Sequence, residues 1–412
     1  MAKCIFLCAM WLVLSLITVL HISFTHGANN TTVIIQTKNS KILEKYTWTF
    51  LDWAYPNDWR RIQAILTDDY VPFNGVPTGL AIWRNKMFVT VPRWNTGVPA
   101  TLNYIDLKTA EKSSPLLIPY PSWQTNSLGS CGKNIVTAHR IQVDKCNRLW
   151  VLDFGNAVLG DSLYGVCPPV LHVIDLKTDK FIRHHVLPQN SLPRYMFRAN
   201  IAVDVESDTC DNVFAYMCDE QGIGLTVYDW AKNTSWHRNF IYAHGMDYQP
   251  ITAGVYGMTL STVAKDGFKT LHFHRFNGNK EFGVRTNILK DQKLMDDQLG
   301  SSQIPIRTFP GQSTSEVIDD NGVMLYTMND HNAIGCWNTA LPHLSMNYTI
   351  VAKDDKALAY PDDIVIGSGF VWILSNSLPF YAASLLNETD INFRISAIAY
   401  PEVIEDTLCQ PT

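Results

Sequence analysis

Polar residues follow six apolar segments of the sequence, and they are the first groups that could carry chemistry. Each segment is a short hydrophobic run typical of a β-strand, and the polar group stands at its carboxyl end. If folding brings these ends to one face, they form a ring that could bind a small molecule. Strand ends also meet solvent, where polar side chains are common without any function. The residues are Arg93, Asp153, Asp219 with Glu220, Arg275, Asn329 with Asp330, and Asn376.

Two histidines, His272 and His274, alternate within one apolar segment, so they lie on the same face of a strand. Imidazole nitrogens are common zinc ligands, and the pair could form part of a metal site. No third ligand is evident in the sequence, and packing between sheets is the alternative that we favour. We therefore predict no metal and no cofactor. The HExxH, GxSxG and P-loop patterns are absent, which argues against the common metalloprotease, esterase and nucleotide-hydrolase classes.

The apolar segments recur as one unit, and this repeat predicts the fold. Gly79–Asp106 is typical of three strands, with breaks at Asn85 and at Thr96–Pro99. Related units follow it, 47 to 64 residues apart when they are aligned on the middle of the second strand. Repeats of about 40–50 residues with four strands each are typical of propeller blades, and these blades are longer. The aligned positions are Val89, Val151, Ala215, His272, Tyr326 and Ile373.

The second strands are apolar on almost every residue, as expected where each blade is packed between two neighbours. The sixth unit lacks a fourth strand, whereas Lys45–Trp53 is a spare strand near the amino terminus. We predict an all-β, six-bladed propeller in which this strand completes the last blade and removes an exposed edge. The alternative is that it packs alone on one side. Large aromatic residues should fill the gaps between blades, namely Trp150, Phe214, Phe273 and Trp372.

The amino terminus indicates export. Lys3 is followed by an apolar run over residues 5–20 and by small residues near position 27, which is typical of a signal peptide; a membrane anchor is the alternative. We predict a signal peptide over 1–27, a flexible tail over 28–43 and a single propeller domain over 44–412. No later segment is long and apolar enough to span a membrane. A secreted glycoprotein is also indicated by acceptor sequons at Asn29, Asn30, Asn233, Asn347 and Asn387.

The composition suits a globular protein with a large core, because 46% of residues are hydrophobic and 17% are charged. The net charge of −5 provides no basic footprint for nucleic acid, so no nucleic-acid partner is predicted. Seven of the nine cysteines lie beyond the signal segment, and none forms a CxxC pair. In an oxidising compartment most of them should pair, with one left over.

Several segments together resemble the yellow and major royal jelly protein family of insects. The resemblance covers roughly residues 45–409 and implies a secreted six-bladed propeller. The family includes proteins linked to melanin pigmentation, some thought to convert dopachrome, as well as salivary binders of biogenic amines and royal jelly nutritional proteins. Membership alone therefore leaves enzyme and binder open. The segments that carry it are Asp68–Tyr70, Phe88–Trp94 with Gly97–Pro99, Asp144–Asp153, Asp219–Gly222 with Gly224–Tyr228, Gly335–Asn338, Leu374–Asn376 and Asn392–Ile395.

The resemblance to the amine binders implies a pocket that this sequence keeps in part. Asn376 matches their asparagine, whereas Leu378 stands where they have an aromatic residue, and Pro361-Asp362 stands near their threonine. A carboxylate could still pair with an ammonium group, but ring stacking at Leu378 is lost. Dopachrome conversion instead requires a base that removes a proton from carbon. Our candidates for it are Asp330, His331 and Asp362, each of which could also be an ordinary polar loop residue.

The resemblance also implies a pairing of Cys336 with Cys409, which would tie the carboxyl-terminal tail to the fifth blade. Two further disulfides are expected among Cys131, Cys146, Cys167 and Cys210, with the connectivity open. Cys218 ends an apolar strand where the family usually has a small residue, and we predict it to be the buried thiol left outside the disulfides.

The sequence therefore predicts a secreted propeller whose partner is a small catechol, indole or biogenic amine, in melanin pigmentation. Whether it isomerises a dopachrome-type compound or only binds its ligand stays open, and a non-catalytic protein of cuticle, eggshell or saliva is the alternative. The expected ligand-binding residues are Arg93, Asp153, Asp219, Asn329, Asn376 and Leu378.

Overall fold

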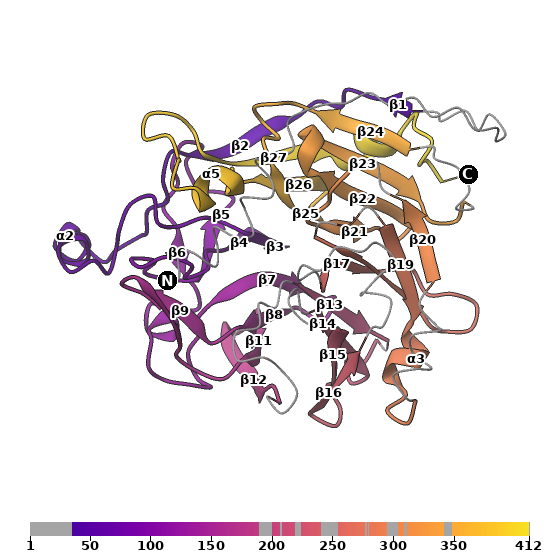
Figure 1. The fold of residues 1–412 in the computed structure, drawn as a ribbon, viewed down its shortest axis with the longest axis horizontal. Coiled ribbons are helices and arrows are strands. Elements are labelled where there is room, and N and C mark those ends of the chain that lie inside the picture. Colours follow the sequence, from indigo (N-terminus) through magenta and orange to yellow (C-terminus); the bar gives the residue numbers. More distant parts are fainter. Residues whose placement is uncertain are drawn as a thin grey trace, which may run out of the picture.

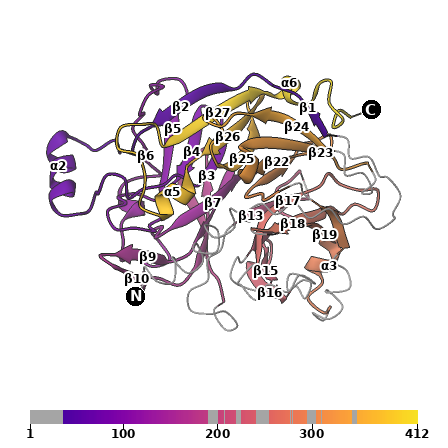
Figure 2. The ribbon, with the colours of Figure 1, turned by 45° about the horizontal axis from the view of Figure 1, so that its top comes forward.

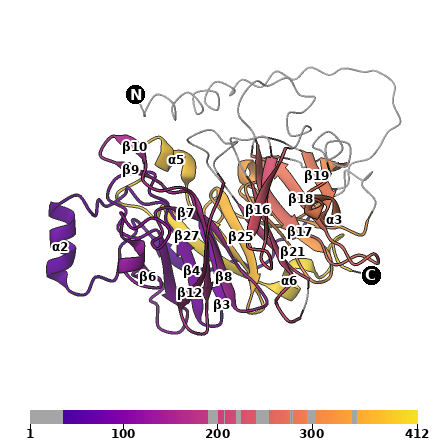
Figure 3. The ribbon, with the colours of Figure 1, turned by 90° about the horizontal axis from the view of Figure 1, so that it is seen from below.

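The computed structural model describes residues 35–188, 200–206, 208–218, 224–239, 254–276, 278, 280–294, 304–308, 311–341 and 348–411. Most of them form six blades, each with four antiparallel strands, arranged around a central axis (Figure 1). Seen from the side, α2 (Asp58–Leu66) projects from the rim, where Asn57 caps its first turn (Figure 3).

Each sheet is one blade with its strands numbered outward from the axis. Blade 1 consists of β3 (Gly79–Trp83), β4 (Lys86–Thr90), β5 (Leu102–Asp106) and β6 (Ile118–Pro119). Blade 2 consists of β7 (Ala138–Val143), β8 (Arg148–Asp153), β11 (Val170–Asp175) and β12 (Lys180–Val186). Blade 3 consists of β13 (Ile201–Val205), β14 (Val213–Cys218), β15 (Gly224–Asp229) and β16 (Thr234–Asn239). Blade 4 consists of β17 (Val255–Leu260), β18 (Thr270–Arg275), β19 (Lys280–Arg285) and β20 (Ile304–Thr308).

Blades 5 and 6 complete the ring. Blade 5 consists of β21 (Glu316–Ile318), β22 (Val323–Met328), β23 (Ala333–Asn338) and β24 (Tyr348–Lys353). Blade 6 consists of β25 (Pro361–Gly367), β26 (Phe370–Ser375), β27 (Phe393–Ala399) and β2 (Leu43–Trp48). Shorter elements lie between them: a hairpin of β9 (Asn156–Leu159) and β10 (Ser162–Gly165), the helices α3 (Thr286–Lys290), α5 (Leu378–Ala382) and α6 (Tyr400–Ile404), and the 3-10 turns η1 (Gln124–Asn126) and η3 (Asn329–His331).

The innermost strands form a closed ring. β3 contacts β7, and contacts continue through β13, β17, β21 and β25 back to β3, with all six strands gathered around the middle of Figure 1. The six aligned sequence positions all fall in second strands, from Val89 in β4 to Ile373 in β26. The prediction of a six-bladed propeller is therefore confirmed.

Large apolar side chains fill the spaces between blades, as the doubly buried second strands require. Trp150 of blade 2 belongs to one core cluster with Val203 and Met217 of blade 3. Trp372 of blade 6 likewise shares a cluster with Val89 of blade 1, so apolar packing continues across the closure of the ring.

The amino-terminal strand closes the last blade as predicted. β2 pairs antiparallel with β27, with Trp48 opposite Phe393 (Figure 2). The strand is shorter than the predicted span over Lys45–Trp53, because the chain leaves the sheet after Trp48. Trp53 instead forms an isolated bridge to Leu117 of blade 1.

The predicted flexible tail over 28–43 is wrong for its second half. β1 (Ile35–Thr37) runs parallel to β24 as a fifth strand of blade 5, and the Gln36 amide side chain bonds to the backbone of Asp406 and Leu408. An unpaired sheet edge offers backbone donors and acceptors to any nearby extended segment, so local polarity did not reveal this strand. Residues 1–34, with the predicted signal peptide, Asn29 and Asn30, lie outside the described part. Within it, no helix is long and apolar enough to cross a membrane.

Candidate functional site

The innermost strands of blades 2, 4 and 6 each contain a β-bulge near their amino-terminal ends. The register shifts between Ala138 and Ile141 in β7, between Val255 and Gly257 in β17, and between Pro361 and Asp363 in β25. Such bulges redirect side chains and are frequent next to active sites. The described innermost strands of blades 1, 3 and 5 pair with their neighbours in regular register. One residue from each bulge, namely Arg140, Tyr256 and Asp362, belongs to a set that we call the bulge cluster.

A glycine makes room for the bulge in blade 2. A Cβ atom on Gly79 would come within 2.3 Å of the carbonyl oxygen of His139. The Thr90 hydroxyl donates a hydrogen bond to the same oxygen. The missing side chain thus allows β3 to approach the bulged backbone and satisfy its acceptor.

Arg140 joins blade 2 to the two carboxylates at the start of β25. Its guanidinium lies 3.4 Å from Asp362 Oδ1 and 3.3 Å from Asp363 Oδ2, and it donates to the carbonyl oxygens of Asp362 and Thr78. Burial lowers the pKa of Arg140, but the two carboxylates outweigh burial and raise it. The guanidinium therefore stays charged, and one positive charge faces two buried carboxyl groups.

Asp362 is fully buried, and its two carboxylate oxygens differ in their contacts. Asn376 Nδ2 donates to Asp362 Oδ2 over 2.9 Å and to the carbonyl oxygen of Pro77 over 2.9 Å. Asp362 Oδ1 accepts no hydrogen bond from the residues that the structure describes, and it forms an ion pair with Arg140. Burial raises the pKa of Asp362 to about 6, although Arg140 and the Asn376 bond act in the opposite direction. This carboxyl group can exchange a proton near neutral pH.

A buried hydrogen-bond network fixes the peptide before Asp362. Asn329 Nδ2 donates to the carbonyl oxygen of Pro361 over 2.8 Å, and the Thr314 hydroxyl donates to the same oxygen over 3.1 Å. The Ser315 hydroxyl donates to Asp363 Oδ1 over 2.7 Å. Blade 5 therefore positions the bulge of blade 6.

Aromatic rings line the region beside Arg140. Tyr256 lies 6.3 Å from the His139 ring and 4.9 Å from the Phe276 ring, centroid to centroid. The Trp94 ring lies 5.4 Å from the same His139 ring. The site thus combines a cation, a carboxyl group and several aromatic faces, which is the usual make-up of a small-molecule site.

Comparison with known proteins shows the family of this chain. Residues 136–409 match the family model described as Major royal jelly protein. The chain is 39% identical over 383 residues to protein yellow of Drosophila melanogaster, covering 90% of this chain and 71% of that protein. It belongs to the major royal jelly protein family. Protein yellow of Drosophila erecta gives the same identity and coverage. A solved regucalcin, titled a calcium-binding protein, from Agrobacterium tumefaciens aligns over 89% of this chain and 97% of its own, with 10% identity and a TM-score of 0.47.

The predicted site residues of this major royal jelly family member lie in different surroundings. Asp362, Asn376 and Asn329 come together around the bulge of blade 6. Leu378 starts α5, where its N–H donates to Asn376 Oδ1 over 3.2 Å and its side chain packs against the core of blades 1 and 6. Asp219 and Glu220 lie outside the described residues.

Arg93 and Asp153 have their polar atoms engaged by the backbone. Every guanidinium nitrogen of Arg93 donates to carbonyl oxygens, so that one side chain links the loop at Val98 to the segment at Ile135 and Val136. Asp153 accepts hydrogen bonds from the N–H groups of Val136, Thr137 and Gly155. These contacts give both residues a part in holding loops of blades 1 and 2.

Asp330 and His331 lie together on η3. His331 Nδ1 is 2.8 Å from Asp330 Oδ1, and both side chains are more than a third exposed. No described contact joins this pair to Asp362, so only one of the three predicted base candidates belongs to the bulge cluster.

The bulge cluster also contains residues that the sequence did not single out. Arg140 and Tyr256 lie near the starts of β7 and β17, and a bulge leaves no mark in a single sequence. The charge of Arg140 within an innermost strand was the available signal.

Cys336 bonds to Cys409, as predicted. The four cysteines whose connectivity was left open pair as Cys131–Cys167 and Cys146–Cys210. Cys218 is a buried thiol outside these bridges. It donates to the carbonyl oxygen of Tyr256 over 3.3 Å, and so supports the bulge of blade 4. Among the predicted sequons, Asn233 and Asn387 are exposed, and Asn347 lies outside the described part.

Proposed function

We propose that this chain is a secreted protein that binds a small catechol- or indole-derived compound at the bulge cluster and isomerises it in melanin pigmentation. The observation that supports the proposal most directly is Asp362, a buried carboxyl group with a pKa of about 6 and one oxygen that accepts no hydrogen bond from the described part of the chain. A general base works best when its pKa lies near the operating pH. The three disulfides support export, because such bonds persist in oxidising compartments.

In the proposed reaction the ligand ring stacks on the aromatic side chains near Tyr256 and His139. Asp362 removes a proton from a ring carbon of a dopachrome-type quinone, and the electron pair moves towards a quinone oxygen. That oxygen then takes up a proton, so the product is an isomer and no oxidant or reductant is consumed. Arg140 lies within ion-pair distance of Asp362 and stabilises negative charge that develops beside it.

A binding function without turnover is the second candidate, and charge favours it. Arg140 supplies one positive charge against Asp362 and Asp363. The excess negative charge suits a ligand with an ammonium group, as in a biogenic amine. The rings around Tyr256 would then provide the stacking that Leu378 does not.

Both candidates require the site to open. Asp362 and Asn376 are fully buried, so a ligand reaches them only after neighbouring groups move. We therefore expect slow association of the ligand, because a required conformational change lowers the association rate.

The deciding experiment follows dopachrome decay by absorbance with the purified chain. The isomerase proposal predicts that dopachrome decays faster with the protein than in buffer. Asp362→Asn should abolish this acceleration, whereas Asp330→Asn, on the exposed pair, should leave it intact. A decay rate equal to that in buffer, together with measurable binding of a biogenic amine, would establish the second candidate. Loss of activity in Asp330→Asn alone would show that the catalytic base lies on η3.

A further inference from the structure

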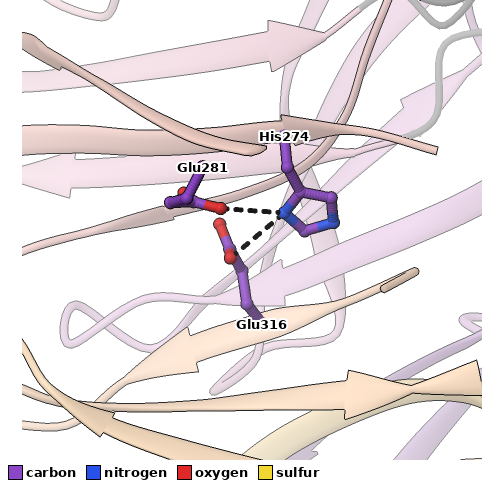
Figure 4. Close-up of side chains that lie close together, drawn as sticks. All are labelled: His274, Glu281 and Glu316. Carbon is purple, nitrogen blue, oxygen red and sulfur yellow. Dashed lines mark hydrogen bonds and ion pairs between the residues drawn. The ribbon is translucent and has the colours of Figure 1, made fainter. Parts of the chain in front are cut away.

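Three ionisable side chains from two blades meet in a buried cluster between blades 4 and 5. His274 comes from β18, Glu281 from β19 and Glu316 from the start of β21. Their side chains are fully buried. His274 Nδ1 lies 3.3 Å from Glu281 Oε2 and 3.2 Å from Glu316 Oε2, and Figure 4 shows both carboxylates facing this nitrogen. We call these residues the His-Glu-Glu cluster.

The other imidazole nitrogen of His274 determines the role of Nδ1. Nε2 lies 3.1 Å from the carbonyl oxygen of Ser313, which can only accept, so Nε2 carries a proton. Metal-binding histidines usually donate their second N–H to a backbone carbonyl or a carboxylate in this way. Nδ1 is therefore the atom that is available to a cation, and it points between the carboxylates.

The charges of the three groups do not balance among themselves. With both glutamates ionised and the imidazole protonated, the three groups carry a net charge of −1 in a buried place. Glu316 Oε1 is buried and accepts no hydrogen bond from the residues that the structure describes. Both carboxylates lie within 3.3 Å of the same nitrogen atom, so a cation at this point would contact all three side chains.

The distances match those of a metal site. Zinc bonds to imidazole nitrogen and carboxylate oxygen are about 2.0–2.2 Å long, so the donor atoms of a tetrahedral site lie about 3.3–3.5 Å apart. The two separations from Nδ1 are close to this value. We propose that His274, Glu281 and Glu316 bind a divalent transition-metal cation of the zinc class, which links blade 4 to blade 5 and leaves a fourth position for water.

The surrounding backbone is built around the imidazole. A Cβ atom on Gly257 would lie 2.1 Å from the His274 ring, so this position of β17 accommodates the ring only as glycine. Ser315, next to Glu316, donates to Asp363 of the neighbouring blade. The cation would therefore stabilise the strand end that also supports the bulge cluster, without belonging to it.

The test uses the full secreted chain, stripped with a chelator and then titrated with Co²⁺. We expect one equivalent of Co²⁺ to give the visible absorption of a four-coordinate nitrogen and oxygen site, without the charge-transfer band of a thiolate, and Zn²⁺ to displace it. Zn²⁺ should also raise the thermal unfolding midpoint, because a cation that binds only the folded state stabilises it.

Glu316→Gln and His274→Gln should each lower Co²⁺ affinity by at least about tenfold. His185→Gln, on the outer strand of blade 2, is the matched control and should leave affinity unchanged. Circular dichroism establishes that each variant is folded. If the variants do not fold, the stoichiometry of Co²⁺ binding and the absorption spectrum of the Co²⁺-loaded wild-type protein decide whether the site exists. Absence of Co²⁺ uptake by the wild-type chain, or unchanged affinity in folded Glu316→Gln, would overturn the proposal.

Discussion

The guanidinium of Arg140 lies 3.4 Å from the Asp362 carboxylate, although the two residues belong to blades that are not neighbours. Blade 1 stands between them, and Arg140 also donates to its backbone at Thr78. A single cation therefore links three blades at the axis, and both the stability and the chemistry of the site should depend on it.

Replacing Arg140 with methionine keeps much of the side-chain volume but leaves two buried carboxyl groups without their counter-ion. Removing one partner of a buried ion pair typically costs about 3–5 kcal/mol, and we expect a loss of this size in the free energy of unfolding measured with denaturant. Arg61→Met is the control, because its bond to Asp52 is partly exposed and should be worth at most about 1 kcal/mol. Equal losses in the two variants would contradict this account.

Asp362 should make stability depend on pH in a defined window. Its folded-state pKa is about 6, whereas an unfolded aspartate has a pKa of about 3.9. The folded state thus holds a proton that the unfolded state has already lost, and stability falls as pH rises from about 4 to about 6. We expect wild type to lose about 3 kcal/mol relative to Asp362→Asn over this range. Denaturant unfolding at pH 4, 5, 6 and 7 measures the difference; parallel curves would refute it.

The Cys336–Cys409 disulfide closes a long loop from blade 5 to the carboxyl terminus, with a sequence separation of 73. Loop entropy for that length predicts a stabilisation of about 4 kcal/mol. Changing both cysteines to alanine should lower the free energy of unfolding by about this amount, with the other two disulfides still formed. Mass spectrometry of the native protein checks that they are. A loss below about 1 kcal/mol would show that the tail is held by its other contacts.

The two amino-terminal strands should differ in importance. A chain that starts at Lys41 lacks β1 but keeps β2, so we expect it to fold with slightly lower stability. A chain that starts at Thr49 lacks β2 and exposes the full edge of β27, which should cause aggregation. Secreted yield and size-exclusion profile compare the two. A monomeric, folded product from the shorter chain would contradict the role of β2 in closing the ring.

Much of the fold could be predicted because it depends on local pattern. Second strands such as that of Val151 are apolar throughout, since packing buries both of their faces, and a repeated run of this kind is visible in one sequence. The strand β1 was missed because its pairing with β24 depends on an edge more than 300 residues away. Nothing in the composition of Ile35–Thr37 marks that partner.

The site could be predicted only in part. Asp362 and Asn376 were found through the resemblance, and the structure joins them by a hydrogen bond. The positions of Arg140 and Tyr256 at the axis depend on bulges. A bulge is a shift in the pairing of two strands, and the amino-acid pattern of one strand does not reveal it. Arg93 was expected among the ligand-binding residues, but its donors are used by five carbonyl oxygens that no local pattern predicts. The proposed metal ligands could not be predicted from the sequence for a similar reason, because Glu316 of blade 5 contacts His274 of blade 4 across a blade boundary.

The bulges fall on alternate blades, so a ring with sixfold pseudo-symmetry presents three bulged positions about its axis. Each position carries a different chemical type: a cation at Arg140, a phenol at Tyr256 and an acid at Asp362. Because the extra residue of a bulge has no opposite partner in the ladder, its side chain can change without shifting the register of the blade. The ring is therefore sixfold in its blades but threefold in its bulges, and the three side chains at the axis can differ in chemical type while the pairing of the strands stays the same.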